Sequence, residues 1–249
     1  MRIRYLKKTE ELLASSPWVV QAPEAWKGLW REQMSGEQSE YKTPAARQRL
    51  SLEIGCGKGK YICEMAKNHP DQLFIGDERV STILARTVLK AEKESDDSHA
   101  LGALSNLRLI RVTAEELEAV FAPGEVDRIF LTFSDPWPKE KHAKRRLTSD
   151  RFLPIYQRLL SPQGDLCFKT DNDALFAWSL ESLLSVGWRI LERTDDLHGA
   201  LEKQDFGPVS SPEAPFAAAN PGVLVTTEYE ENFIRIGKNI HYLRAVPPV

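Results

Sequence analysis

Cysteine and metal-ligand patterns are scarce in this sequence. It has three cysteines and five histidines among 249 residues. Cys56, Cys63 and Cys167 are odd in number and lie inside apolar stretches, so we expect small core residues and no disulfide framework. Neither the cysteines nor the scattered histidines have the spacing of metal ligands. The sequence therefore predicts a chain without disulfides and without a bound metal.

The sequence also lacks a long apolar run. Its first five residues mix charged side chains with Ile3 and Tyr5 and lead into no apolar segment, so neither a signal peptide nor a membrane span is expected. The composition, 42% hydrophobic and 28% charged, is that of an ordinary globular protein. We expect a cytoplasmic protein with one α/β domain over residues 1–249, in which residues 1 to about 45 form a basic extension.

Little net charge is present, because the formal total is −3. Total charge bears on solubility and association rather than on a particular site. The basic residues are nevertheless concentrated in two short stretches, residues 2–8 and residues 139–146. A solvated surface is the ordinary role of such a run, and a phosphate-binding surface is the alternative.

Apolar, β-rich runs alternate with segments of helical periodicity. Strands are expected at Leu50–Ile54, Leu73–Gly76, Leu107–Val112, Val126–Phe133 and Asp165–Lys169, with Trp188–Glu192 and Ile240–Val246 as further candidates. Helices are expected at Tyr61–Asn68, Thr82–Lys93, Glu115–Phe121, Arg151–Leu160 and Leu175–Val186. These repeated units predict a parallel sheet with helices on both faces. Residues 95–105 and about 207–222 are expected to be loops.

A glycine-rich loop, Gly55-Cys56-Gly57-Lys58-Gly59, follows the first expected strand. Its glycines would let the backbone turn tightly and approach a ligand. The third glycine comes one residue earlier than in the dinucleotide fingerprint, which favours a ligand without phosphates. Glu78 follows the second strand, where an acidic side chain accepts both ribose hydroxyls. Glu53 at the first strand tip suits the positive groups of S-adenosylmethionine; the alternative is that it caps the glycine turn.

The ends of the third and fourth strands should contribute to the same site, because ligands of such sheets lie at the carboxyl ends of the strands. Thr113 and Ala114 follow the third strand, and Ser134-Asp135-Pro136-Trp137-Pro138 follows the fourth. We expect the prolines to hold this loop extended, with an exposed Trp137 beside Asp135. The basic stretch comes next, which would combine stacking, base-edge pairing and phosphate contact. The alternative is a rigid turn before a charged helix start.

These motifs resemble those of the bacterial tRNA (guanine-N7-)-methyltransferases. The matching segments are Leu52–Gly59, Phe74–Gly76 with Glu78, Phe133–Lys139 running on to His142 and Lys144–Leu147, Phe168–Asn172, and Thr227–Phe233 with Gly237. The Asp-Pro-Trp-Pro stretch with its basic tail is the most specific of them. The resemblance runs through almost the whole chain.

The resemblance implies a Rossmann-like fold of S-adenosylmethionine-dependent methyltransferases, with a mostly parallel seven-stranded sheet and an antiparallel C-terminal strand. It also implies methyl transfer to N7 of a guanine in the tRNA variable loop, with S-adenosylhomocysteine as product. The implied cofactor-binding residues are Glu53, Gly55, Gly57, Glu78, Thr113, Ala114 and Asp135. The implied substrate-binding residues are Lys139, Asp171, Thr227, Glu228, Tyr229 and Glu230.

Two departures from the family pattern bear on these roles. Thr113 stands where the family usually has an aspartate that is expected to accept a hydrogen bond from the adenine amino group. A threonine hydroxyl accepts as a neutral, weaker partner, so cofactor affinity would be lower unless Glu115 or Glu116 substitutes. The loop before Thr227 is longer than the family norm, which leaves its part in substrate recognition open. Thr227 and Glu230 also have the spacing of a helix capping box.

Methyl transfer to guanine N7 needs no general base, because N7 has an in-plane lone pair and no proton. Catalysis is therefore expected to rest on alignment, without a covalent enzyme intermediate. Asp135 is the expected catalytic residue, with Asp171 second, because a carboxylate favours the positive charge that develops on the base. Lys139 and Arg145 are expected to hold phosphates, and His142 to make a phosphate or structural contact.

Two other functions remain open at this point. The glycine loop and Glu78 also suit a nicotinamide-dependent oxidoreductase, which leaves the Asp-Pro-Trp-Pro stretch without a role. Thr113 keeps open an RNA-binding module that retains the fold but has lost the cofactor. The sequence does not determine whether the protein is a monomer or a homodimer.

Overall fold

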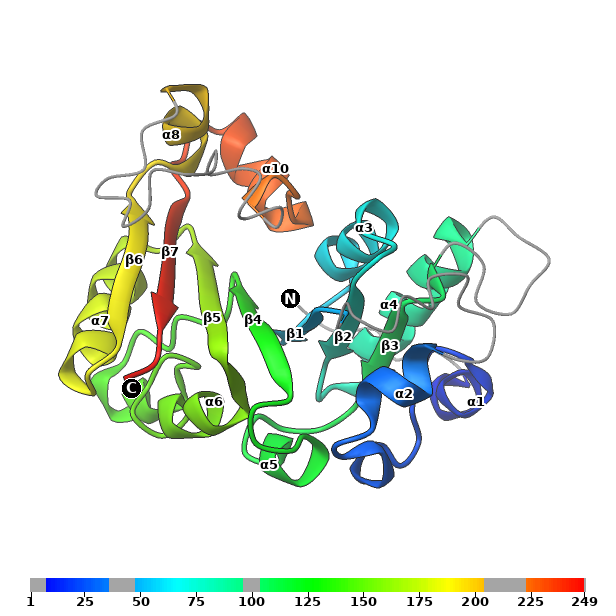
Figure 1. Ribbon diagram of the computed structural model, residues 1–249. Coiled ribbons are helices and arrows are strands. Elements are labelled where there is room, and N and C mark those ends of the chain that lie inside the picture. The colour runs from blue at the N-terminus through cyan, green and yellow to red at the C-terminus, as the bar shows by residue number, and fades with distance from the viewer. Residues whose placement is uncertain (1–7, 36–47, 96–103, 204–222, 249) are drawn as a thin grey trace.

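Strands and helices alternate through most of the computed structural model, which describes residues 8–35, 48–95, 104–203 and 223–248 (Figure 1). The strands are β1 (Leu50–Ile54), β2 (Leu73–Asp77), β3 (Leu107–Ile110), β4 (Val126–Thr132), β5 (Leu160–Thr170), β6 (Arg189–Thr194) and β7 (His241–Val246). The α-helices are α1 (Thr9–Ser15), α2 (Trp30–Ser35), α3 (Lys60–Asn68), α4 (Ser81–Glu94), α5 (Leu117–Val120), α6 (Leu153–Leu159), α7 (Asp173–Ser185), α8 (Leu197–Lys203) and α10 (Glu228–Arg235). Two 3-10 helices are η1 (Pro23–Trp26) and η3 (Glu140–Arg145).

The described strands form one seven-stranded sheet in the order β3-β2-β1-β4-β5-β7-β6. β1 is parallel to β2 and β4, and the parallel pairing continues to β3 on one side and β5 on the other. β7 enters between β5 and β6 and is antiparallel to both. The predicted mostly parallel sheet with an antiparallel C-terminal strand is confirmed. Because the strand order reverses beside β1, the carboxyl ends of β1 and β4 mark the expected ligand site.

Alternate strand residues face two different helical layers. One face packs against α3 and α4 and includes Phe74, Leu107, Leu109 and Phe130. The opposite face packs against α5, α6 and α7 and includes Leu52, Ile75, Ile129, Leu131 and Phe168. All three cysteines are free and buried, as the sequence predicted. Both faces of the central strands are therefore buried, which explains their nearly continuous apolar sequences.

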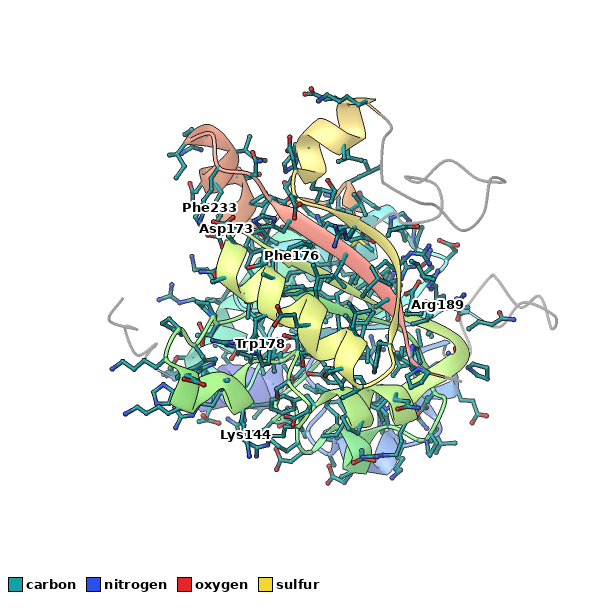
Figure 2. The ribbon with its side chains drawn as sticks, turned by 90° about the vertical axis from the view of Figure 1, so that its left-hand side faces the viewer. Lys144, Asp173, Phe176, Trp178, Arg189 and Phe233 are labelled. Carbon is teal, nitrogen blue, oxygen red and sulfur yellow. The ribbon has the colours of Figure 1, made fainter. Side chains whose placement is uncertain are left out.

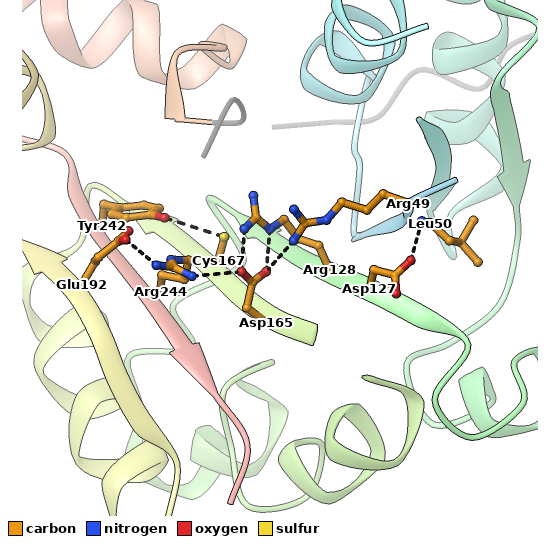
Figure 3. Close-up of polar contacts among 9 residues, drawn as sticks. All are labelled: Arg49, Leu50, Asp127, Arg128, Asp165, Cys167, Glu192, Tyr242 and Arg244. Atoms are coloured by element: carbon orange, nitrogen blue, oxygen red, sulfur yellow. Dashed lines mark hydrogen bonds and ion pairs between the residues drawn. The ribbon is translucent and has the colours of Figure 1, made fainter. Parts of the chain in front are cut away.

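A row of charged side chains crosses the sheet on the α3 and α4 side (Figure 3). The Arg128 guanidinium donates to both carboxylate oxygens of Asp165 at 2.5 Å. Arg49 and Arg244 approach the same carboxylate to 3.5 and 3.3 Å, and Arg244 also donates to Glu192. These residues lie on or next to β1, β4, β5, β7 and β6. Their ion pairs therefore link each of these strands to its neighbour at a fixed position along the sheet.

The described N-terminal residues pack against the edge of the sheet. Helix α1 contacts α4, and Val20 N donates to Leu109 O at 3.0 Å while Leu109 N donates to Trp18 O at 2.8 Å. Trp30 is fully buried, and its indole Nε1 donates to Val120 O at 3.0 Å. The segment that we expected as a basic extension thus supplies helices and core residues, some beside β3 and others, such as Trp30, against α5.

Several element ends differ from those expected. β5 begins at Leu160, five residues early, because Leu160 pairs with Val126 of β4. β3 stops before Val112, whose N–H donates to the side-chain carboxylate of Asp77 at 3.2 Å instead of to a backbone carbonyl of β2. β4 stops before Phe133, which has a left-handed φ of 51°. The expected loop at residues 207–222, and most of that at residues 95–105, lie outside the described residues.

Among the described residues, no helix has the length and apolar character needed to cross a membrane.

Candidate active site

A cleft of about 940 Å³ lies at the carboxyl ends of β1, β2, β3 and β4. Its walls come from the glycine loop, the residues after β2 and β3, the Asp-Pro-Trp-Pro loop and Thr227 before α10. This volume is at the upper end of the range for small-molecule sites. The cleft therefore lies where a doubly wound sheet binds its ligands, and the predicted residues of four strand ends meet there.

The glycine loop is held by backbone contacts with its neighbours. The N–H groups of Gly55 and Cys56 donate to Asp77 O at 2.9 and 2.8 Å. The Thr87 hydroxyl of α4 donates to Gly57 O at 2.8 Å. At Gly59, where φ is +77°, an added Cβ would lie 2.2 Å from the Thr87 methyl group, so no larger residue fits. The loop thus turns tightly beneath the cleft and leaves its surface open to a ligand.

Glu53 presents a buried carboxylate at the floor of the cleft. Its Oε1 accepts a hydrogen bond from the Thr132 hydroxyl at 2.5 Å. Its Oε2 is buried and accepts no hydrogen bond from any described residue. Burial raises the pKa of the carboxyl to about 7, although the Thr132 hydrogen bond lowers it. A buried oxygen without a partner suits a cationic ligand group, since pairing would remove its desolvation cost.

The alternative role of Glu53, capping the glycine turn, finds no support in these contacts. The amide groups of Gly55 and Cys56 donate to Asp77 O, and not to the Glu53 carboxylate. The carboxylate of Glu53 is thus left for the cleft.

Glu78 and Asp77 form an acidic wall at the end of β2. Glu78 Oε1 accepts from Val80 N at 2.9 Å, and burial raises the pKa of this carboxyl. Asp77 Oδ1 accepts from Val112 N at 3.2 Å, and burial raises the pKa of Asp77 well above its usual range. Asp77 was not singled out from the sequence. Its only signal there is that it precedes Glu78 at the end of the same strand.

Thr113 is held by an acidic residue one helical turn farther along. Both its N–H and its hydroxyl donate to Glu116 Oε2, at 2.7 and 2.9 Å. These two hydrogen bonds lower the pKa of Glu116. With its proton donated to Glu116, the hydroxyl oxygen keeps its lone pairs for a ligand donor. Glu115 also lines the cleft, where it pairs with Arg151 at 2.8 Å, and Ala114 is buried in the wall.

The Asp-Pro-Trp-Pro loop brings Asp135 to the rim of the cleft. Asp135 is exposed and lines the cleft. The expectation of an extended loop with an exposed tryptophan is wrong. Trp137 has a left-handed φ of 42°, is partly buried, and lies with its ring 4.9 Å from the Arg145 guanidinium and 5.7 Å, edge-on, from the His142 ring. The contacts that partly bury the ring come from residues after the loop, which local proline geometry does not reveal.

The basic stretch forms η3 and follows the loop along the protein surface. Lys139, at the N-cap position of η3, is exposed, and so are Lys141, Lys144 and Arg145. Arg145 lines the cleft, whereas Lys139 and His142 lie outside its lining. The exposed cations therefore extend outward from the Asp135 rim, where a larger anionic molecule can reach them.

Of the predicted residues at the end of β5 and the start of α10, Thr227 lines the cleft, whereas Asp171 and Glu230 lie outside its lining. Asp171 is held in an ion pair with Lys238 at 2.6 Å. Thr227 lines the cleft and caps α10, and the predicted capping box with Glu230 is confirmed. Glu230 is fully buried, where its carboxylate lies 3.4 Å from Lys169 Nζ and 3.1 Å from His198 Nε2. The Glu230 carboxylate thus holds the segment in place from inside.

The side chains of Glu228 and Tyr229, two further predicted substrate residues, lie outside the described part of the structure.

Comparison with known proteins assigns this chain to a family. A family model described as "Putative methyltransferase" matches residues 47–243. The tRNA (guanine-N(7)-)-methyltransferase of Lachnoclostridium phytofermentans is 38% identical over 245 residues, which cover 98% of each chain. The enzyme of the same name from Geobacillus kaustophilus is 38% identical over 249 residues, 100% of this chain and 98% of that one. The chain belongs to the tRNA (guanine-N(7)-)-methyltransferase family.

Solved structures of other methyltransferases share the fold of this family member. The 16S rRNA methyltransferase KamB aligns with a TM-score of 0.56 at 14% identity, over 87% of this chain and 92% of that chain. A 16S rRNA (adenine(1408)-N(1))-methyltransferase from Catenulisporales acidiphilia, solved with its cosubstrate SAM, aligns with a TM-score of 0.53 at 16% identity, over 91% and 92%. The predicted Rossmann-like S-adenosylmethionine-dependent methyltransferase fold is confirmed. The family favours the methyltransferase interpretation over a nicotinamide oxidoreductase.

Several cationic side chains of the methyltransferase cleft had not been singled out from the sequence. Arg79, Arg86 and Arg151 line it together with Lys58 and Lys60 of the glycine loop and α3. In the sequence they stand singly within or beside helices, where one basic residue gives no positional signal. Their convergence depends on how the helices and loops pack around the sheet edge.

Proposed function

We propose that this chain transfers the methyl group of S-adenosylmethionine to N7 of a guanine in the variable loop of tRNA. The observation that carries the proposal is its identity of 38%, over nearly its full length, with enzymes named for this reaction. The protein acts as one domain over residues 1–249, and its tRNA substrate places it in the cytoplasm. The packing of α1 on α4 supports the single domain.

The residues of the cleft fit the proposed cofactor. The unpartnered Glu53 oxygen accepts from the amino group, and Glu78 accepts from the ribose hydroxyls through the lone pairs that the N–H groups of Val80 and Gly57 leave free. Thr113 accepts from the adenine amino group. Its hydroxyl proton points to Glu116, which leaves the oxygen lone pairs for the ligand. Gly55 and Gly57 let the backbone approach the ligand, while Ala114 forms part of the wall.

S-adenosylmethionine supplies an electrophilic methyl group, and the pair of electrons of the breaking carbon–sulfur bond leaves with the sulfur. The protein aligns guanine N7 with that carbon, and alignment of this kind can contribute roughly 7–11 kcal/mol. Asp135 accepts from guanine N1–H and N2–H and stabilises the positive charge that develops on the base. It is the catalytic residue, and it also closes the cofactor cleft.

The basic stretch holds the tRNA backbone beside the cleft. Lys139 and Arg145 contact phosphates, and His142 supports this surface through Trp137. Asp171, Thr227, Glu228 and Tyr229 bind the tRNA, and the buried Glu230 takes part by holding Thr227 in place. Their exposed or cleft-lining positions support this assignment for Lys139, Arg145 and Thr227. A loop guanine suits the site because the major groove of an A-form helix is too narrow for N7 to be reached.

The decisive experiment incubates the purified protein with methyl-labelled S-adenosylmethionine and unmodified tRNA transcripts. Label is then mapped by chemical cleavage at N7-methylguanine, with a transcript that lacks the variable-loop guanine as the matched control. Label at that guanine alone is expected. Binding of tRNA without any transfer would instead identify an RNA-binding module, and label at another base would refute the proposed specificity.

A further inference from the structure

Arg146 belongs to the basic stretch by sequence but differs from its neighbours in the structure. Lys144 and Arg145 are exposed, whereas Arg146 is partly buried. Its Nε donates to Pro136 O and its Nη2 donates to Trp137 O, both at 3.1 Å. The planar guanidinium thus binds two successive carbonyls of the loop that carries Asp135.

These two carbonyls flank the most unusual backbone position of the loop. Trp137 has a φ of 42°, a left-handed conformation that a bulky residue seldom adopts. Such a conformation persists only where the surroundings hold it. Two hydrogen bonds from one rigid donor, directed at the peptide groups on either side of Trp137, are suited to that task. Asp135 precedes this position by two residues.

The flat face of the Arg146 guanidinium packs against a tryptophan of helix α7. Its Cζ atom lies 4.5 Å from the centroid of the Trp178 ring. Two more contacts join the same segment to α7: Thr148 Oγ1 lies 2.7 Å from Ser179 Oγ, and the Ser182 hydroxyl donates to Thr148 O at 2.7 Å. Figure 2 shows Trp178 on α7, on the same face of the molecule as Lys144. Since α7 contacts β5, the guanidinium connects the catalytic loop to the sheet through a helix outside the cleft.

We propose that Arg146 is a positioning residue that holds the Asp135 loop in its working conformation by binding the Pro136 and Trp137 carbonyls against Trp178. It differs in this from the exposed cations of the basic stretch, which face solvent and suit phosphates. The inference rests on the proposed function, because the loop matters through the role of Asp135 in methyl transfer.

The test compares Arg146→Ala with Arg145→Ala, the adjacent exposed arginine. For Arg146→Ala, kcat should fall about 10- to 100-fold, as expected for a displaced reacting group. Its affinity for S-adenosylhomocysteine and the salt dependence of tRNA binding should be unchanged. Added guanidinium ion should restore part of the lost kcat, and Arg146→Lys should not restore it, because an ammonium cannot donate to both carbonyls in one plane. For Arg145→Ala, tRNA affinity should fall and the slope of log affinity against log salt should decrease by about 1.

Two outcomes would overturn the proposal. If Arg146→Ala weakens tRNA binding with a smaller salt slope, Arg146 is a phosphate contact. If kcat is unchanged, Arg146 does not position the loop. Trp178→Leu provides a second variant should Arg146→Ala fail to fold. It removes the stacking surface outside the cleft and should lower kcat to a smaller extent, without rescue by guanidinium ion. An unchanged kcat of Trp178→Leu would count against the positioning role of Arg146.

Hydrogen exchange separates this proposal from the proposed function. Amide exchange in residues 136–146 should be faster in Arg146→Ala than in the wild type, whether or not the protein transfers methyl groups. If the wild type transfers no methyl group but the two proteins still differ in exchange, the proposed function is refuted and the positioning role of Arg146 stands. Equal exchange in the two proteins would refute the positioning role itself.

Discussion

At the scale of single residues, the cleft concentrates acidic groups at positions where burial opposes their charge. Glu53 is the clearest case, because one of its oxygens is buried without a partner among the described residues and its pKa is raised to about 7. A carboxyl whose pKa is raised on folding contributes stability fully below its unfolded pKa. That contribution is lost as the pH rises through the folded value. The contribution of Glu53 to the stability of the ligand-free protein should therefore fall as the pH rises from about 4.5 to about 7.

We expect Glu53→Gln to lower the affinity for S-adenosylhomocysteine at pH 7.5 by at least about tenfold, or about 1.4 kcal/mol, since the amide cannot pair with the ligand ammonium. In the wild type, affinity should rise from about pH 5.5 to 7.5 with release of a proton, which calorimetry in buffers of different ionisation enthalpy measures.

Other charged groups act on Glu53, namely Glu78 directly after β2 and Lys169 of β5, so the relevant quantity is the difference between the variant and the wild type. Glu64→Gln, on α3 and outside the cleft lining, is the matched control. If the affinity of Glu53→Gln for S-adenosylhomocysteine depends on pH as that of the wild type does, Glu53 does not bind the ligand ammonium group.

Asp135 is expected to act far more on turnover than on cofactor affinity. Asp135→Asn keeps the shape and loses the charge, so kcat should fall about 100-fold while S-adenosylhomocysteine affinity changes much less. Single-turnover methyl transfer together with calorimetric titration measures the two quantities. Asp150→Asn, at another exposed aspartate, is the control. Near-normal turnover of Asp135→Asn would transfer the catalytic role to another carboxylate, with Asp171 the first to test.

At the scale of elements, α10 is held by both a local and a long-range device. The capping box of Thr227 and Glu230 starts the helix, and it follows from the spacing of the two residues. The burial of Lys169, by contrast, does not follow from any local spacing in the sequence. Its ammonium donates to Val223 O at 3.1 Å and Val225 O at 3.0 Å and lies 3.4 Å from the Glu230 carboxylate. One side chain of β5 therefore positions the segment that brings Thr227 to the cleft.

We expect Lys169→Met to lower the free energy of unfolding by about 3–5 kcal/mol, because it leaves the Glu230 carboxylate buried without its main cationic partner. Urea unfolding measures the change. The double variant Lys169→Met/Glu230→Gln should be less destabilised than the sum of the two single variants. Lys238→Met, which breaks the more exposed pair with Asp171, should cost about 1 kcal/mol or less. Equal effects of the two lysine substitutions would contradict this account of α10.

At the scale of the whole molecule, the charged row across the sheet joins strands that are far apart in the sequence. Burial by itself raises the pKa of Asp165, but the guanidiniums of Arg128, Arg49 and Arg244 outweigh it and lower the pKa below the usual value. A carboxyl with a depressed pKa contributes stability above its unfolded pKa of 3.8 and loses that contribution as the pH falls through the folded value.

Asp165→Asn should therefore destabilise the protein at pH 7 by about 3–5 kcal/mol, since it leaves three arginines without their shared anion. The difference from the wild type should shrink as the pH falls below about 3.8. Urea unfolding at pH 7 and near pH 3 measures both effects, and Asp150→Asn again serves as the control. A difference that does not depend on pH would show that the Asp165 charge is not what stabilises the strand register.

Much of this architecture follows from the sequence alone, because the relevant forces act over a few residues. Alternating apolar runs predicted the parallel strands, the glycine spacing predicted the turn after β1, and Thr227 with Glu230 predicted the start of α10. The acidic residues at the strand ends could be placed together for the same reason, since parallel strands deliver their carboxyl ends to one edge.

Other features depend on contacts between segments that are distant in the chain, which no local pattern encodes. Trp137 is partly buried because Arg145 and His142 pack against its ring, and Arg146 is partly buried because it packs against Trp178 of α7. Glu230 is buried because Lys169 of β5 reaches it. In each case an arginine, tryptophan or glutamate can lie either inside or outside a protein, and the packing partner supplied by another element selects between the two.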